Sequence, residues 1–451
     1  MINKNNSTSL ISSETNSIIK GEIEVPGDKS ISHRALIFAA LANGKSTISN
    51  LLEGEDVLRT ASALQKMGVQ INRNEDLTWQ VNGSGIAGLM EPSDVLDMGN
   101  SGTAARLLMG LVTPFNFNSF FTGDDSLRKR PMQRVFEPLT KIGAKIISRQ
   151  NNILPALLIG SSEPIPINYT MKVASAQVKS SILLAALNTA GTTIITEPEK
   201  CRNHTEIMMN FLGLEIKVDD IEISGKIGSK ISYQSGQEFN ANDFIIPGDI
   251  SSAAFIIVAA LIIPNSKVRI NNVGVNPLRD GIIKTLKEMG GNIELKNQRL
   301  VAGEKVADLI VEYSKLKGID IPSSRAPKMI DEYPILAIAA ANAEGITTMN
   351  GVAELKVKES NRLGAIADGL QNCGVKIKIG EDSLEITGGF KQPKDLVRVK
   401  THLDHRIAMS FLIMGLIIKN GVEIDDCNMI NTSFPTFIEI FNKFGITFKK
   451  S

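Results

Sequence analysis

A short pattern recurs six times along the chain, and no other feature restricts the possible folds as strongly. In each copy, two apolar positions flank two mostly polar ones and precede a glycine, and an isoleucine or phenylalanine follows three residues later. Such evenly spaced repeats predict a fold assembled from one supersecondary unit. The copies are LQKMGVQI, LTKIGAKI, MNFLGLEI, LKEMGGNI, LQNCGVKI and FNKFGITF, and their glycines, 70 to 84 residues apart, are Gly68, Gly143, Gly213, Gly290, Gly374 and Gly445.

Each copy has the pattern of an amphipathic helix that ends at a glycine and leads into a strand. Glycine can take the left-handed conformation that closes many helices. Most units also contain a helix that is apolar on nearly every face, such as RALIFAALANG and VKSSILLAALNTAG, and that must therefore be buried on all sides. Strands rich in β-branched residues, such as GTTIITEP, follow several of these helices. The repeat is thus predicted to be an α/β unit with one inner helix, one outer helix and several strands.

Six units in a chain of 451 residues predict two similar lobes of three units each, since one hydrophobic core rarely serves so long a chain. The boundary is expected near residue 246, within FNANDFIIPGDISSAAF. The strand in IIKGEIEVPG precedes the first inner helix and is expected to belong to the second lobe. The predicted lobes are therefore residues 28–245, and residues 1–27 together with 246–451.

Polar and charged motifs stand at the beginnings of the apolar helices. A helix N-terminus presents unpaired N–H groups and a partial positive charge, so it favours anions. If the inner helices of a lobe run parallel, their N-termini gather at one end, and two facing lobes would form one anion-attracting cleft. The motifs are PGDKSISHR (26–34), MGNSGTAAR (98–106), ASAQVKS (174–180), PGDISS (247–252), MIDEYP (329–334) and HLDHR (402–406).

The first motif carries two cations where a helix end disfavours them. Asp28 and the serines can be explained as helix caps, but Lys29 and Arg34 stand at a positive helix end. A bound anion would explain why positively charged side chains stand at a positive helix end. The stretch does not match the spacing of a nucleotide-binding P-loop, because Asp28 separates Lys29 from Gly27, whereas the lysine of that motif directly follows its second glycine.

Three other motifs allow both a structural and a functional interpretation. In GDDSLRKRPM, Arg128 and Lys129 are expected to be solvated, whereas Arg130 is a candidate for anion binding. KVKESNRL is predicted to place Lys358 and Arg362 on one helix face, which would be an exposed ion-pair face unless an anion binds there. HLDHR is either an ordinary helix start or a further cationic site.

Composition argues against several classes of function. A net charge of +1 and 5% aromatic residues oppose a clamp around nucleic acid, which needs a basic stripe and stacking rings. The three cysteines are far apart, and no metal-ligand or serine-nucleophile motif occurs, so neither a disulfide framework, a metal site nor a serine nucleophile is expected. The first fifteen or so residues are predicted to be a flexible polar tail without targeting character, in a cytoplasmic protein.

These motifs together resemble the 5-enolpyruvylshikimate-3-phosphate synthase (EPSP synthase) family over nearly the whole chain. The resemblance rests on PGDKSISHRAL, GNSGTAARLLMG, GDDSLRKRPM, ASAQVKS, RAPKMIDEYPILA, VKESNRL and HLDHRIAMS. It implies an α/β fold of two similar lobes, each with three βαβαββ repeats around parallel buried helices, also described as an inside-out α/β barrel. It further implies no cofactor or metal, no nucleic-acid or membrane partner, and a monomer in the cytoplasm.

The reaction that the resemblance implies transfers the enolpyruvyl group of phosphoenolpyruvate to the 5-hydroxyl of shikimate 3-phosphate and releases phosphate. Each substrate carries a carboxylate and a phosphate, so the site must hold roughly five to six negative charges. The residues implied for shikimate 3-phosphate are Lys29, Ser30, Arg34, Ser175, Ala176, Gln177, Arg202, Asp331 and Lys358. Those implied for phosphoenolpyruvate are Lys29, Asn100, Gly102, Arg130, Gln177, Arg362 and Arg406.

The resemblance also implies catalytic roles for four residues. Asp331 is expected to accept the proton of the attacking hydroxyl. Either Lys29 or Glu359 is expected to deliver the proton to C3. Lys29 and His405 are expected to stabilise the phosphate as it develops or leaves.

Three positions distinguish branches of the family or a related activity. Thr432 stands where one branch has a lysine, and Arg202 stands where that branch has a tyrosine. Gly102 is alanine in the herbicide-insensitive members, so we expect glyphosate to compete with phosphoenolpyruvate here. The related UDP-N-acetylglucosamine enolpyruvyl transferases have a reactive cysteine in the loop corresponding to TPFNFNSFFTGDDSLRKR, and this chain has none there.

Overall fold

The structure is a computed structural model that describes residues 8–13 and 17–450. The chain forms two compact units, each with its own hydrophobic core. Unit 1 comprises Met1–Pro26, Gly248–Arg299 and Lys305–Ser451, and unit 2 comprises Gly27–Pro247 and Leu300–Glu304. Residues 300–304, which the sequence placed with the second lobe, are grouped with unit 2.

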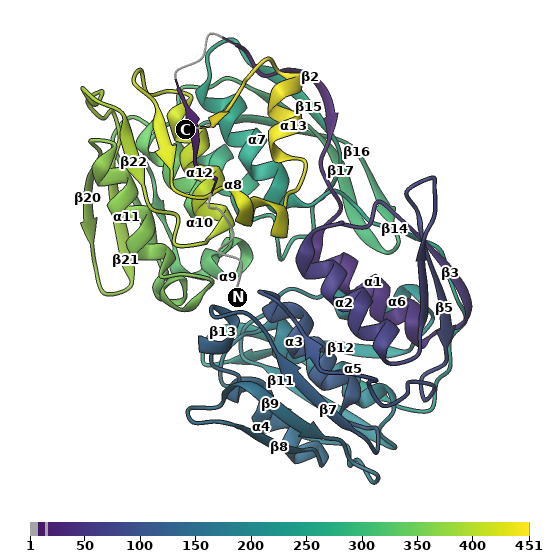
Figure 1. Cartoon of the computed structure of the whole chain (residues 1–451). Helices are drawn as coiled ribbons and strands as arrows, with labels where there is room; N and C mark the ends of the chain where they lie inside the picture. The colour runs from purple at the N-terminus through teal and green to yellow at the C-terminus, as the bar shows by residue number, and fades with distance from the viewer. Residues whose placement is uncertain (1–7, 14–16, 451) are drawn as a thin grey trace, which may run out of the picture. The chain divides into compact units, whose positions relative to one another are not determined.

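Every repeat has the order βαβαββ and contributes one four-stranded sheet, so the described residues form six such sheets. In each sheet the first two strands are parallel and the others antiparallel, with the fourth strand of the repeat between the second and the third. The predicted α/β class and repeat are confirmed, although no sheet of the described residues closes into a barrel (Figure 1).

Unit 2 contains the first three repeats of the chain. The first consists of β14 (Phe244–Ile245), α1 (Lys29–Leu41), β3 (Asn43–Ser49), α2 (Glu55–Lys66), β4 (Gln70–Arg73) and β5 (Trp79–Ser84). The second consists of β6 (Leu96–Asp97), α3 (Gly102–Val112), β7 (Asn118–Thr122), the 3-10 turn η1 (Leu127–Lys129), α4 (Gln133–Ile142), β8 (Lys145–Arg149) and β9 (Ile153–Ile159). The third consists of β10 (Asn168–Thr170), α5 (Ala176–Leu187), β11 (Thr192–Glu197), α6 (His204–Phe211), β12 (Ile216–Ile223) and β13 (Lys226–Gln234).

Unit 1 contains the other three repeats. The fourth consists of β2 (Lys20–Glu24), α7 (Ile250–Ile262), β15 (Lys267–Gly274), α8 (Gly281–Glu288), β16 (Asn292–Val301) and β17 (Glu304–Glu312). The fifth consists of β18 (Asp320–Ile321), η2 (Ser323–Arg325), α9 (Ala326–Met329), α10 (Tyr333–Ala341), β19 (Ile346–Asn350), η3 (Ala353–Val357), α11 (Arg362–Asn372), β20 (Lys376–Ile379) and β21 (Ser383–Thr387). The sixth consists of β22 (Val397–Val399), α12 (His405–Gly415), β23 (Val422–Ile424), η4 (Asn428–Thr432), α13 (Phe437–Lys443), β24 (Lys449–Lys450) and β1 (Leu10–Ser12).

The N-terminal segment supplies strands to two repeats of unit 1. The strand β2 pairs in parallel with β15, and β1 lies between β23 and β24 in the sixth sheet. The expectation of a flexible tail is therefore wrong for Leu10–Ser12, because the sheet there needs a fourth strand that the C-terminal repeat lacks. Residues 1–7 and 14–16 of that predicted tail lie outside the described residues.

The predicted helix ends and inner helices are confirmed. All six glycines of the recurring pattern have positive φ, from 75° to 127°, as the left-handed closing position requires. The inner helices α1, α3, α5, α7, α10 and α12 are buried over nearly their whole length. Among the described residues, no helix combines the length and the apolar character that crossing a bilayer demands.

The inner helices α3 and α5 of unit 2 approach each other closely at a glycine. A Cβ on Gly110 would lie 2.1 Å from the backbone oxygen of Ser181. We expect Gly110→Ala to lower the free energy of unfolding by about 1–3 kcal/mol, because the two backbones must separate. Urea denaturation would measure this. The control is Gly364→Ala in α11, where the nearest atom is the amide nitrogen of Asn361 at 3.1 Å. An unchanged stability of Gly110→Ala would contradict the close packing.

Candidate active site

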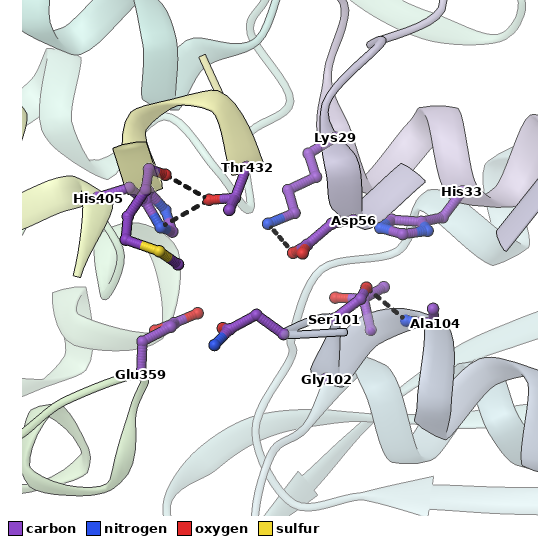
Figure 2. Close-up of polar contacts among 12 residues, drawn as sticks. Lys29, His33, Asp56, Ser101, Gly102, Ala104, Glu359, His405 and Thr432 are labelled. Atoms are coloured by element: carbon purple, nitrogen blue, oxygen red, sulfur yellow. Dashed lines mark hydrogen bonds and ion pairs between the residues drawn. The ribbon is translucent and has the colours of Figure 1, made fainter. Parts of the chain in front are cut away.

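The first turn of α1 holds Lys29 against an acidic partner. Asp28 caps the helix by accepting a hydrogen bond from the Ile31 N–H at 2.9 Å. The ammonium group of Lys29 forms an ion pair with Asp56 of α2, whose side chain is nearly buried (Figure 2). This carboxylate offsets the unfavourable position of a lysine at a positive helix end. It also fixes where the ammonium group points.

His33 and Arg34 follow on the same helix and are both buried. Burial, with the nearby charges of Lys29 and Arg34, lowers the pKa of His33 well below its ordinary value, so His33 is neutral at pH 7. Arg34 donates to the hydroxyls of Thr205 and Ser180 at 2.7 and 2.6 Å. Burial lowers the pKa of Arg34 to about 10, against the opposing charge of Glu206, so this guanidinium is still protonated at neutral pH.

The first turns of α3 and α5 meet in the same unit. Arg106 donates to the Gln177 side-chain oxygen at 2.8 Å, and Gln177 donates to the Thr103 hydroxyl at 2.9 Å. Ser101 caps α3 by accepting from the Ala104 N–H at 3.1 Å (Figure 2). The N-termini of α3 and α5 are thus adjacent, as parallel inner helices require.

Gly102 leaves room for two guanidinium groups at this helix start. A Cβ there would lie 2.7 Å from a terminal nitrogen of Arg106 and 3.2 Å from one of Arg130. Arg130 donates to the Asn100 side-chain oxygen at 2.6 Å and is itself buried. Its neighbours Arg128 and Lys129 lie nearer the surface, and Arg128 pairs with Asp125, so the expectation that these two are solvated is confirmed.

Two further candidates of unit 2 lie at the starts of α5 and α6. Ser175 caps α5 by accepting from the Val178 N–H at 3.5 Å, and Ala176 begins that helix. Arg202 is half-buried in the segment between β11 and α6. Ser30 offers its backbone oxygen to Arg34 at 2.8 Å.

Arg362 is the centre of the corresponding group in unit 1. Its side chain is fully buried and pairs with Asp404 at 2.8 Å, Asp331 at 3.2 Å and Glu359 at 2.5 Å. Although burial alone would lower it, these three carboxylates hold the pKa of Arg362 above its ordinary value. The guanidinium thereby brings together segments that precede α10, α11 and α12.

The predicted helix face of KVKESNRL is wrong. Lys358 follows the 3-10 turn η3 with an extended backbone, and α11 begins only at Arg362. Asn361 starts that helix by accepting from the Gly364 N–H at 3.2 Å. Since residues 358–361 lie outside any helix, Lys358 and Arg362 do not share a helix face.

His405 and Thr432 lie side by side at the start of α12. The Thr432 hydroxyl donates to the Met429 carbonyl at 2.7 Å and lies 3.3 Å from the Nδ1 atom of His405 (Figure 2). Because its only proton is used, the hydroxyl accepts from Nδ1–H, which fixes the tautomer of the ring. Asp404 caps α12 through the Arg406 N–H at 3.0 Å, and Arg406 is largely buried.

The candidate residues therefore form two groups, one in each unit. In unit 2 they are Lys29, Ser30, Arg34, Asn100, Gly102, Arg130, Ser175, Ala176, Gln177 and Arg202. In unit 1 they are Asp331, Lys358, Glu359, Arg362, His405 and Arg406. The sequence missed two residues that fix the orientation of these groups: Asp56 and Asp404. Asp404 lies inside a recognised motif and could have been identified as a cap, whereas nothing in the sequence links Asp56 to Lys29.

The sequence of this chain is similar to that of a known family of enzymes. The profile of the family EPSP synthase (3-phosphoshikimate 1-carboxyvinyltransferase) matches residues 13–441. The chain belongs to the EPSP synthase family. A 3-phosphoshikimate 1-carboxyvinyltransferase of Paramagnetospirillum magneticum is 52% identical over 435 residues, which cover 96% of this chain and 97% of that protein.

Solved structures agree with this EPSP synthase assignment. The EPSP synthase of Acinetobacter baumannii has a TM-score of 0.86 and 41% identity, covering 99% of this chain and 100% of that one. The enolpyruvyl transferase NikO of Streptomyces tendae has a TM-score of 0.77 at 16% identity, with 99% of both chains covered. At that identity, the second likeness supports the fold alone.

Proposed function

We propose that this chain carries out the reaction of the EPSP synthase family with the two groups of residues described above. In that reaction, the 5-hydroxyl of shikimate 3-phosphate attacks C2 of phosphoenolpyruvate, and phosphate is released. The observation that carries the assignment of residues is that three buried arginines lie within the first two turns of helices: Arg34 in α1, Arg362 in α11 and Arg406 in α12. An anion there gains from both the guanidinium groups and the helix end.

Shikimate 3-phosphate is proposed to bind mainly to residues of unit 2. Arg34 has a guanidinium whose position is set by neutral partners, the hydroxyls of Thr205 and Ser180, so its charge is not neutralised by a direct ion pair with them. Ser30 lies in the first turn of α1, and Ser175, Ala176 and Gln177 lie at the start of α5. Arg202 lies two residues before α6. From unit 1, Asp331 and Lys358 are proposed to contact this substrate.

Phosphoenolpyruvate is proposed to bind to arginines of both units. Arg130, with Asn100, Gly102 and Gln177, would serve from unit 2, and Arg362 and Arg406 from unit 1. Lys29 is proposed to contact both substrates. Thr432 supplies no positive charge beside His405, so the cationic contact that a lysine would provide at this position is either missing or supplied by another residue.

The chemistry needs one proton acceptor, one proton donor and a stabiliser of phosphate. Asp331 is proposed to take the proton of the 5-hydroxyl while the hydroxyl oxygen bonds to C2 of phosphoenolpyruvate. At the same time C3 gains a proton from Lys29 or Glu359. The tetrahedral intermediate then loses a proton from C3, which returns to the group that donated it, as the bond from C2 to the phosphate oxygen breaks and phosphate leaves. Lys29 and His405 are proposed to stabilise the departing phosphate.

Phosphate release from phosphoenolpyruvate, measured with and without shikimate 3-phosphate, tests the proposed function. We expect release only when both substrates are present. UDP-N-acetylglucosamine as the acceptor should give none. Release with that acceptor, or no release with shikimate 3-phosphate, would contradict the proposal.

Glyphosate inhibition should depend on Gly102. We expect glyphosate to compete with phosphoenolpyruvate. Gly102→Ala should raise the inhibition constant of glyphosate by at least about tenfold, because the added methyl group crowds Arg106 and Arg130. The inhibition constants of both enzymes would be measured at limiting phosphoenolpyruvate. The matched control is Gly364→Ala, which should keep the wild-type inhibition constant. Unchanged turnover of the wild type at millimolar glyphosate would reject the expectation.

A cytoplasmic monomer is proposed as the working form of the enzyme. The net charge of +1 and the three free cysteines suit a reducing compartment without a strongly charged partner. Light scattering during gel filtration should give a mass near 48.8 kDa. A mass twice as large would contradict the monomer.

A further inference from the structure

The first turn of α6 connects three parts of unit 2 through consecutive buried side chains. His204 pairs through Nδ1 with Glu304 at 2.6 Å. Thr205 accepts from Arg34 at 2.7 Å and shares a hydrogen bond of 2.6 Å with Ser180. Each of these side chains is at most 4% exposed.

The third residue of that turn, Glu206, joins a lysine that has no contact with solvent. Lys179 of α5 is 0% exposed and lies 2.7 Å from Glu206 and 2.9 Å from Glu197. It also donates to the backbone oxygen of Cys201 at 3.3 Å, just before Arg202. Burial lowers the pKa of Lys179, but Glu206, Cys201 and Glu197 outweigh that effect and raise it above its ordinary value.

This arrangement is a costly way to stabilise a core. Replacing a buried ion pair by apolar side chains of similar volume is often neutral or stabilising, so stability alone does not call for it. What the network does is connect Arg34 of α1, the helix start at Ser175 and the segment that carries Arg202. All three belong to the group proposed to bind shikimate 3-phosphate.

We propose that Thr205 and Ser180, backed by the ion pairs of Lys179 with Glu206 and Glu197, are positioning residues that orient Arg34 for shikimate 3-phosphate. This rests on the role proposed for Arg34 above. The two hydroxyls occupy the Nε–H and one terminal N–H of the guanidinium, and the Ser30 carbonyl takes another terminal N–H. Two of its five N–H groups then remain for the substrate, aimed in a fixed direction. Since the hydroxyls are uncharged, they orient Arg34 without competing with an anionic substrate.

The test replaces each hydroxyl without changing the shape of the site. For Thr205→Val, we expect the KM for shikimate 3-phosphate to rise about tenfold or more, the effect of one lost hydrogen bond to a charged group. The KM for phosphoenolpyruvate and kcat should stay within about twofold. Thr205→Ser, which keeps the hydroxyl, should restore the wild-type KM. Ser180→Ala should act in the same direction, and it provides the same test if Thr205→Val does not fold.

Two controls separate this role from general stability and from the function itself. Thr113→Val removes an equally buried hydroxyl, which bonds only to its own helix at the Met109 carbonyl, and should leave every KM unchanged. If the wild type turns over shikimate 3-phosphate but Thr205→Val and Ser180→Ala bind this substrate as tightly as the wild type does, the positioning role is wrong. If the wild type does not turn over shikimate 3-phosphate at all, the proposed function fails first. Direct calorimetric titration with shikimate 3-phosphate should give the same ranking of the variants.

Discussion

Asp331→Asn is expected to lower kcat by about 10²–10⁴-fold, the usual contribution of a positioned general base. The amide keeps the size of the side chain and can still accept the hydrogen bond that Arg362 donates at 3.2 Å. It cannot take a proton from the 5-hydroxyl. The KM values should change much less than kcat, because only the proton transfer is lost. Single-turnover measurement of phosphate release would give the chemical rate.

The matched control is Asp320→Asn in the same unit. Asp320 accepts a hydrogen bond from Asn350 at 2.7 Å on the exposed edge of its sheet, and its replacement should leave kcat unchanged. A wild-type kcat in Asp331→Asn would mean that another group accepts the proton of the 5-hydroxyl. A raised KM with an unchanged kcat would mean that Asp331 only binds the substrate.

Arg362→Met is expected to cost about 3–5 kcal/mol of unfolding free energy and to abolish turnover. The arginine is fully buried, and its removal leaves Asp404, Asp331 and Glu359 without their shared cation. Methionine fills much of the same volume, so the loss would be electrostatic. Urea denaturation would measure the loss of stability, and phosphate release would measure the loss of turnover.

The control for Arg362 is Arg398→Met, which removes an exposed arginine paired with Glu423 at 2.8 Å. Such surface pairs contribute about 0–1 kcal/mol, so its stability should hardly change. Equal stability of Arg362→Met and the wild type would show that the three carboxylates do not depend on this cation. Retained turnover in Arg362→Met would remove Arg362 from the proposed phosphoenolpyruvate site.

The repeat could be predicted from the sequence because its signals are local. The six glycines have the positive φ that their helix ends require, and the apolar helices are buried as their lack of a polar face demands. The cationic motifs were also identifiable, since Lys29 and Arg34 stand where a helix end disfavours positive charge. These motifs could be identified because the charge of a side chain conflicts with the partial charge of the helix end on which it stands.

The rest depended on contacts between distant residues, which leave no local signal. Asp56 reaches Lys29 from another helix, and the strand at Leu10 pairs with strands near the opposite end of the sequence. KVKESNRL misled because the spacing of Lys358 and Arg362 suits a helix, whereas Asn361 starts a new one between them. Thr205 and Lys179 looked like ordinary helix residues until their partners were known.

A crystal structure with shikimate 3-phosphate bound is the most direct test of the claim that anions bind at the N-termini of the inner helices. We expect its phosphate and carboxylate within hydrogen-bonding distance of Arg34, Ser175 and Gln177, at the starts of α1 and α5. The ligand bound elsewhere, with those three side chains contacting only protein or water, would contradict the account.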